Sequence, residues 1–304
     1  MAGVVARLPD IAAVARIEDA ARAADGRPSL GEAVWRDLER PGPESAGFLA
    51  DERAYVHVAR SDNFSPRHWA VGTVVAPTAR GGDDRARLLA DAVRHVAAHG
   101  GGRMVLWVFG AGEADDAELQ AYGWRREREL HEMRVALPLD AQAHWAQAQW
   151  PPGIEVRPFE VGRDEQAWLE VNNRAFGNHP EQGGWIESTL ARRMAEPWFD
   201  PSLFLLAFDG EGLAGFNWMK VHDAHGRDPR LGEIFVIGVD PRVHGSGLGR
   251  ALAIAGLDEV ARRGITTGSL FVAAENEPAL RLYRSLGFTV HRSDRAYERI
   301  VDAA

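Results

Sequence analysis

The chain contains no cysteine among its 304 residues. This absence excludes disulfide bonds, thiolate metal ligands and any mechanism that holds an acyl group on a cysteine. Basic residues are outnumbered, because 35 lysines and arginines stand against 44 acidic residues and give a net charge of −9. That balance argues against nucleic acid as the main partner and would suit a small cationic substrate.

Long apolar runs are also missing. No stretch approaches the roughly 18 residues that span a bilayer, and the N-terminus lacks the basic leader and apolar segment of a signal peptide. We therefore expect a cytoplasmic monomer with no membrane partner. The pair His222-x-x-His225 lacks a third ligand nearby, so no metal is expected.

What the sequence does contain is an internal repeat. Pro77 recurs as Pro241 and Gly123 as Gly287, each 164 residues later, and the apolar run at Leu106 recurs at Leu270 with the same offset. The constant offset predicts a duplicated domain. Prolines and a glycine at 151–153 favour a join there, which gives domains of residues 1–149 and 150–304.

The second half alternates strand and helix patterns, which predicts an α/β fold with a mixed sheet flanked by helices. A glycine inside one of the strands, Gly238, indicates either a bulge or a close backbone approach. The last strand is expected to complete the sheet of this half. The predicted strands cover 154–157, 203–208, 213–221, 233–239, 269–273 and 288–297, and the predicted helices cover 165–176, 248–263 and 278–286.

A glycine-rich turn lies between the strand that ends at Val239 and the helix that begins at Leu248. Glycines let backbone N–H groups converge on an anion, and a helix N-terminus adds its dipole, so the turn fits a pyrophosphate. A plain tight turn is an equally good interpretation from these residues alone. The lysine of a P-loop and the G-x-G-x-x-G spacing of a dinucleotide site are both missing.

The turn resembles the acyl-CoA signature V-x-P-x-x-(Q/R)-x-x-G-x-G of the GCN5-related N-acetyltransferases (GNATs). His244 stands where that signature has glutamine or arginine, and a shifted register beginning at Arg242 restores the arginine but breaks the proline spacing. Residues 275–288 also resemble the family, in which an asparagine caps a helix beside the cofactor and a tyrosine faces the thioester. The segments 179–185, 198–201 and 232–233 are similar to the mycothiol synthase family.

This resemblance implies two tandem GNAT domains, each a mixed, mostly antiparallel sheet flanked by helices. It implies acetyl transfer from acetyl-CoA to the cysteinyl amine of a cysteine–glucosamine–inositol conjugate, giving mycothiol. Because no cysteine can carry the acetyl group, we expect direct attack in a ternary complex. Two alternatives stay open: a GNAT that acts on another amine, such as an aminoglycoside or a protein N-terminus, and a non-catalytic acyl-CoA-binding module.

The resemblance also implies site roles, with Glu233 as general base and Tyr283 as general acid. From position alone, Glu233 is equally typical of a surface charge at a strand edge, and Tyr283 of a core tyrosine. At Phe271 the family usually has a tyrosine, so one substrate hydroxyl contact is lost. The implied acetyl-CoA residues are Ile237, Gly238, Val239, His244, Gly245, Ser246, Gly247, Leu248, Gly249, Arg250, Asn276, Glu277, Pro278, Ala279, Leu280 and Arg281, and the implied acceptor residues are Glu32, Glu181, Lys220, Glu233 and Phe271.

The first copy of the turn is degenerate, because Asp83 and Arg85 replace the glycines Gly247 and Gly249. A carboxylate beside a pyrophosphate is repelled by roughly 1–4 kcal/mol at about 4 Å, depending on the dielectric. We therefore predict that the first domain does not bind acetyl-CoA in the usual manner. Isothermal titration calorimetry should find one acetyl-CoA site per chain, and two equivalent sites would contradict the prediction.

Overall fold

The computed structural model describes residues 10–61, 68–140, 147–177, 182–224 and 228–304. The chain divides into two compact units: Met1–Leu130 with Arg292–Ala304, and His131–His291. Two strands, β5 and β11, contribute residues to both units. No helix in the described ranges is long and apolar enough to cross a membrane.

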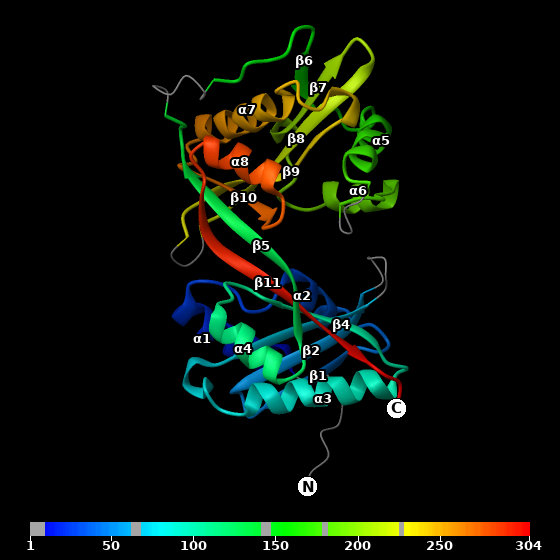
Figure 1. Ribbon diagram of the computed structural model, residues 1–304, viewed down its shortest axis with the longest axis vertical. Helices are drawn as coiled ribbons and strands as arrows, with labels where there is room; N and C mark the ends of the chain where they lie inside the picture. Colours follow the sequence, from blue (N-terminus) through cyan, green and yellow to red (C-terminus); the bar gives the residue numbers. More distant parts are fainter. Residues whose placement is uncertain (1–9, 62–67, 141–146, 178–181, 225–227) are drawn as a thin grey trace. The chain divides into compact units, whose positions relative to one another are not determined.

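The first unit is a mixed sheet with helices on both faces (Figure 1). Its strands follow the order β1-β2-β3-β4-β11, with β5 next to β11. Among the first four strands, β1 with β2 and β2 with β3 pair antiparallel, whereas β3 and β4 pair parallel. Its elements are α1 (Ile11–Asp25), α2 (Glu32–Glu39), β1 (Ala46–Ala50), β2 (Ala54–Ser61), β3 (His68–Val75), η1 (Pro77–Ala79), α3 (Asp84–Ala98), β4 (Gly102–Val108), α4 (Glu113–Ala121) and the start of β5 (Arg125–Ala136).

The second unit repeats this plan in the order β5-β10-β9-β8-β7-β6, where β9 and β10 are the parallel pair. The predicted elements all occur, with ends that shift by a few residues. Helix α6 is an addition that the sequence pattern did not reveal. The elements are β6 (Glu155–Pro158), α5 (Glu165–Ala175), α6 (Glu187–Met194), η2 (Pro201–Leu203), β7 (Phe204–Asp209), β8 (Gly212–His222), β9 (Leu231–Val239), η3 (Pro241–Val243), α7 (Leu248–Arg262), β10 (Thr267–Ala273), α8 (Glu277–Ser285) and β11 (Thr289–Val301).

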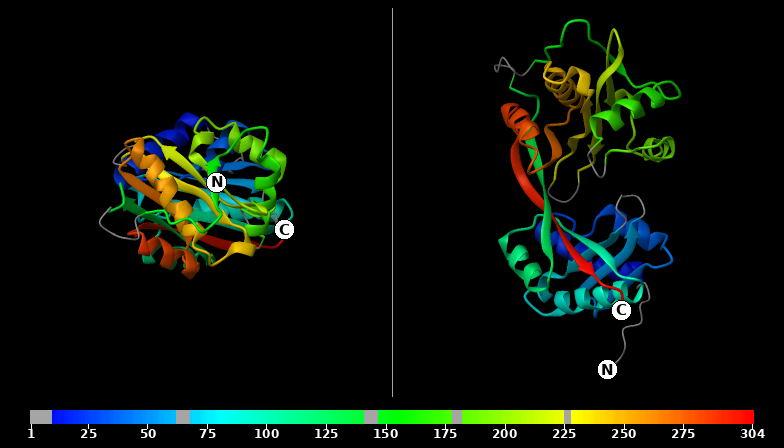
Figure 2. Two further views of the ribbon diagram at one scale, coloured as in Figure 1. Left: turned by 90° about the horizontal axis from the view of Figure 1, so that it is seen from above. Right: turned by 45° about the vertical axis from the view of Figure 1, so that its right-hand side comes forward.

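Each face of the second unit's sheet has its own apolar core. Helices α7 and α8 cover one face, and α5 and α6 cover the other, as Figure 2 shows from two further directions. The α5 side is aromatic: the ring of Trp218 stacks on Phe204 at 4.5 Å and meets Trp168 edge-on at 5.9 Å. Such pairs add to the burial energy and fix the position of β8 against α5.

Corresponding helices of the two units are separated by the same 164 residues as the repeated sequence features. Helix α7 begins and ends 164 residues after α3, and α8 does the same relative to α4. The strands before these helices differ in one respect. The pairing of β8 with β9 slips by one residue between Trp218 and Met219, whereas the pairing of β2 with β3 is regular throughout. The second unit therefore carries one inserted residue, Phe235, as a β-bulge.

The last strand does not finish the sheet of the second half alone. Residues 295–301 of β11 pair antiparallel with 102–108 of β4 and belong to the first unit. In exchange, the end of β5 lies beside β10 in the second unit, where the amide of Leu137 donates to the carbonyl of Thr266. The boundary at residue 149 was predicted for the two copies of the repeat, and it stays a prediction. The compact units of the structure divide between residues 130 and 131 and again between 291 and 292.

Candidate active site

The strands β9 and β10 separate partway along their length. Their parallel pairing covers only Gly232–Ile234 of β9 and Gly268–Leu270 of β10. Beyond Ile234 the edge of β9 that faces β10 is unpaired within the described residues. An exposed strand edge is a row of amide donors and carbonyl acceptors that an extended ligand can pair with.

The bulge lies at the same point. Phe235 is the unpaired residue, and its ring packs 5.0 Å from Trp198 and 5.5 Å from Trp218, measured between centroids. A bulge bends its strand and increases the local twist, and here the bend coincides with the end of the pairing between β9 and β10. Gly238 was expected to mark either a bulge or a close approach, and it marks an approach: an added Cβ would lie 2.7 Å from the Phe216 ring.

The carboxylate of Glu233 lies just before the bulge, and its side chain is 11% exposed. Its Oε2 is 2.5 Å from Nε2 of His222 on the neighbouring strand β8. Within the described residues Oε1 accepts no hydrogen bond, and it is not enclosed. The carboxylate thus has one oxygen held by the protein and one open to a ligand. The sequence pattern around His222 suggests only a metal ligand and gives no sign of this contact.

Two other predicted acceptor residues share the face of Glu233. Lys220 is its cross-strand partner on β8, and Ser269 is its partner on β10, two residues before Phe271. Directly opposed residues, and residues two apart on a strand, point to the same face of a sheet. The ammonium of Lys220 lies 4.9 Å from the Trp198 ring centroid, and Phe271 is 43% exposed.

The glycine turn holds unused amide donors. Among the described residues, the backbone N–H groups of Gly245, Gly247, Gly249 and Arg250 donate to no other group, whereas those of Val243, His244 and Ser246 donate to carbonyls within the turn. An added Cβ at Gly245 or Gly247 would meet nothing within 4 Å, so the space beside the turn is open. Both have positive φ, which favours glycine. The turn therefore has unused donors and open space of the kind that an anion requires.

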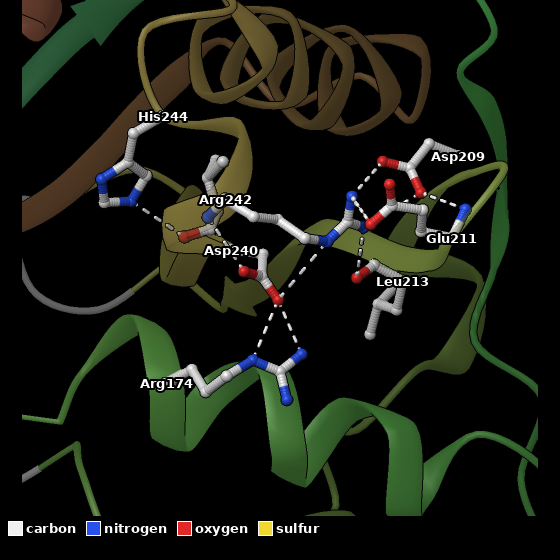
Figure 3. A network of polar contacts seen from close by, with 8 residues as sticks. Arg174, Asp209, Glu211, Leu213, Asp240, Arg242 and His244 are labelled. Atoms are coloured by element: carbon white, nitrogen blue, oxygen red, sulfur yellow. Dashed lines mark hydrogen bonds and ion pairs between the residues drawn. The ribbon is translucent and has the colours of Figure 1, made fainter.

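His244, which departs from the family signature, is used inside the turn. Its Nε2 lies 3.1 Å from the carbonyl oxygen of Val239. Arg242, the alternative signature arginine, is fully engaged elsewhere, because its guanidinium makes two hydrogen bonds to Asp209 and one to the Leu213 carbonyl (Figure 3). The structure therefore favours the register set by the proline, with His244 at the signature position.

Asp240 anchors the start of the turn to the rest of the unit. Its buried carboxylate accepts two hydrogen bonds from Arg174 of α5, at 3.0 and 2.6 Å, and one from the amide of Arg242 (Figure 3). Burial by itself raises the pKa of Asp240, but these bonds and the two positive charges outweigh it and hold the pKa below its usual value. The charged form is the one that locks the turn to α5.

Helix α8 presents the other predicted motif. Asn276 caps it as predicted, with Oδ1 accepting from the amide of Ala279 at 3.2 Å, and Pro278 follows in the first turn. Tyr283 lies on the inner face of the helix against Phe288, on the α7 side of the sheet. Burial raises the pKa of Tyr283 to about 12, so its phenol stays protonated at neutral pH.

Two predicted acceptor residues are not among those that share the face of Glu233. Glu32 belongs to the first unit, where it is exposed in the first turn of α2, and Glu181 lies outside the described residues. The loop that follows Glu181 is held by two asparagines of α5 that sequence reasoning missed: Asn172 donates to the Gln182 carbonyl, and Asn173 pairs with both backbone groups of Trp185. Within the described chain no cluster of candidate metal ligands occurs.

The corresponding region of the first unit has neither a carboxylate nor a phenol at the positions of Glu233 and Tyr283. The pairing register places Ala70 where the second unit has Glu233, and the 164-residue offset places Leu119 at the position of Tyr283. Arg85, in place of Gly249, bridges Asp115 and Glu118 at 3.3 and 2.9 Å. A cavity of about 320 Å³ remains beside these residues. The prediction that this unit does not bind acetyl-CoA in the usual way stays a prediction.

Comparison with known proteins agrees with this architecture. The profile of the Acetyltransferase (GNAT) family matches residues 145–288. Mycothiol acetyltransferase of Thermobispora bispora is 42% identical over 95% of this chain and 96% of its own, and that of Thermomonospora curvata is 40% identical over 95% and 94%.

Solved structures agree as well. A GCN5-related N-acetyltransferase from Sphaerobacter thermophilus superposes with a TM-score of 0.73, at 26% identity, over 99% of this chain and 96% of its own. A tandem GNAT protein from the clavulanic acid biosynthesis pathway has a TM-score of 0.71 at 15% identity, over 98% and 97%. The predicted tandem GNAT fold is confirmed.

The anchoring role of Asp240 predicts a pH-dependent stability. Because its pKa is lowered in the folded state, its contribution is complete above the unfolded value near 4 and is lost as the pH falls through the folded value. Asp240→Asn should cost about 2–4 kcal/mol at pH 7, and this difference from the native chain should shrink below about pH 4. Urea unfolding measures both; Asp223→Asn, at an exposed carboxylate, is the control. A pH-independent difference would refute the ionic anchor.

Proposed function

The chain belongs to the mycothiol acetyltransferase family, and on that premise we propose that its second unit transfers acetyl from acetyl-CoA to the cysteinyl amine of 1D-myo-inositol 2-(L-cysteinylamino)-2-deoxy-glucopyranoside, giving mycothiol. The observation that carries the proposal is the full-length similarity at about 40% identity. The open turn and the Glu233 carboxylate beside an unpaired strand edge support it.

Acyl-CoA, the donor that GNAT proteins use, fits the second unit. The free amides at 245, 247, 249 and 250, at the N-terminus of α7, would hold the pyrophosphate. The unpaired edge at Ile237, Gly238 and Val239 would pair with the amides of the pantetheine arm. Residues 276–281 of α8 and its cap would line the other side. Acetyl-CoA supplies the thioester whose carbonyl the acceptor attacks.

Glu233 is suited to take the proton that the acceptor amine loses. An α-amino group has a pKa near 7.7–8.0, so a sizeable fraction is neutral near pH 7 and a carboxylate is a sufficient base. The free Oε1 of Glu233 would accept this proton as the nitrogen–carbon bond forms and the carbon–sulfur bond breaks. The same carboxylate would attract the ammonium form of the acceptor on its way in.

Tyr283 is suited to supply a proton to the departing thiolate. Its pKa of about 12 keeps the phenol protonated through the physiological range, and it occupies the position on α8 whose tyrosine faces the thioester in the family that the motif resembles. The protonated phenol of Tyr283 thus complements the carboxylate of Glu233. Their opposite roles follow from their environments, because Tyr283 is enclosed in the α7 core and Glu233 keeps one free oxygen.

The acceptor would meet the face that carries Glu233, Lys220 and Phe271. The ammonium of Lys220 can donate to sugar or inositol hydroxyls, and the exposed ring of Phe271 offers an apolar surface in place of a hydroxyl. Glu181 and Glu32 are proposed as further acceptor ligands from the resemblance. The first unit, with Ala70 and Leu119 at the two reactive positions, is proposed to have no acetyltransferase activity of its own.

Acceptor choice tests this function. Coenzyme A release should be followed with the cysteinyl-glucosaminyl-inositol, with aminoglycosides and with peptides as acceptors. We expect kcat/KM for the first to exceed the others by about 100-fold or more, because a site built for hydroxyls rejects acceptors that leave its polar groups unpaired. Faster acetylation of another amine would overturn the acceptor, and no acetyl transfer to any amine would overturn the enzyme assignment.

Removing the base should separate turnover from donor binding. Glu233→Ala should lower kcat about 10²- to 10⁴-fold, the range typical of general bases, while the Kd for acetyl-CoA stays nearly unchanged. Steady-state kinetics and calorimetry measure the two quantities, and Glu155→Ala, at an exposed carboxylate of β6, is the control. Equal turnover in Glu233→Ala would remove this residue from the chemistry.

A further inference from the structure

His222 contacts one of the two carboxylate oxygens of Glu233, Oε2, and leaves the other, Oε1, free. It lies at the end of β8, two residues after Lys220, and its side chain is 36% exposed. Its Nε2 lies 2.5 Å from Oε2 of Glu233. Because an ionised carboxylate only accepts hydrogen bonds, the proton of a neutral His222 must be on Nε2. The other ring nitrogen, Nδ1, forms no hydrogen bond with a described residue and is not enclosed.

This contact has two consequences for the base. While His222 is neutral, its N–H restricts the rotation of the carboxylate and leaves Oε1 as the oxygen that can take a proton. When His222 is protonated through Nδ1, the imidazolium forms an ion pair with Glu233, favours its charged form and makes it a weaker base. The side chain therefore sets both the orientation and the strength of the base.

Other described charged groups lie near His222 in the sequence or on adjoining elements. They include Lys220 on its own strand, Asp223 directly after it, Arg230 before β9 and Arg193 of α6 near the Phe235 ring. Asp223 is 97% exposed and Arg230 is 53% exposed, so solvent screens both. Ser269, the β10 partner of Glu233, is uncharged. Glu233 is the one carboxylate in direct contact with His222 among the described residues.

We propose that His222 is the positioning residue of Glu233, fixing one carboxylate oxygen so that the other meets the acceptor amine, and weakening the base when the imidazole takes up a proton. The proposal rests on the proposed function, because it assigns a partner to the same general base. His222 touches neither substrate in this role and acts only through the carboxylate.

Substitutions at His222 separate the two effects. His222→Ala should lower kcat about 10- to 100-fold, the usual cost of losing a hydrogen bond to a charged group, with an unchanged Kd for acetyl-CoA. His222→Gln places an amide N–H near the position of Nε2 and should restore most of kcat above neutral pH. His291→Gln, at an exposed histidine of β11, is the matched control. A glutamine variant as slow as the alanine variant above neutral pH would overturn the positioning role.

The pH profile is the readout that a merely structural histidine would not move. Glutamine cannot take up a proton, so the fall of log kcat towards acid pH should be shallower in His222→Gln than in the native enzyme by one ionisation. An unchanged profile would overturn the proposal. Circular dichroism would reveal whether His222→Ala folds. If it does not fold, the pH profile of His222→Gln still tests the proposal.

A double-mutant cycle distinguishes this proposal from the proposed function itself. If His222 acts through Glu233, then adding His222→Ala to Glu233→Ala should lower kcat no further. A further 10-fold loss in the double variant would refute the inference. If Glu233→Ala alone leaves kcat unchanged, the general-base assignment fails. If Glu233→Ala is slow but His222→Ala is fully active, only the present inference fails.

Discussion

One inserted residue in β9 lies at the centre of the candidate site. Phe235 interrupts the pairing with β8 at the point where the pairing with β10 ends, just beyond Glu233. The carboxylate comes before the insertion, the unpaired edge comes directly after it, and the open turn follows at the strand's end. These three features therefore follow one another along β9, around the point where both of its pairings are interrupted.

The first unit has the same fold but lacks the bulge and the carboxylate. Its strand β3 also pairs with its parallel neighbour over only three residues, but β3 pairs regularly with β2 and carries alanine at the position of Glu233. Arg85, at the position of Gly249, donates hydrogen bonds to two carboxylates of α4. The fold alone therefore supplies a fissure and a helix N-terminus, while side chains at a few positions supply the chemistry.

Sequence reasoning was strongest where one residue type has one local use. Glycines at 245 and 247 need positive φ, and Asn276 caps its own helix, so both motifs could be recognised without the fold. The bulge at Phe235 leaves no such mark, because the strand stays apolar through it. The hydrogen bond from His222 to Glu233 joins residues on two strands and depends on register. Likewise, the strand exchange of β5 and β11 depends on which strands become neighbours, which local periodicity does not encode.

The exchange of strands has a consequence for how the molecule is made. The sheet of the N-terminal half needs the antiparallel partner that the end of β11 provides for β4, and those residues are synthesised after the whole of the second unit. The first half therefore keeps an open sheet edge until residues 295–301 have been made, although domains usually fold in order of emergence. No single cut of the chain between the two halves therefore yields two complete folding units.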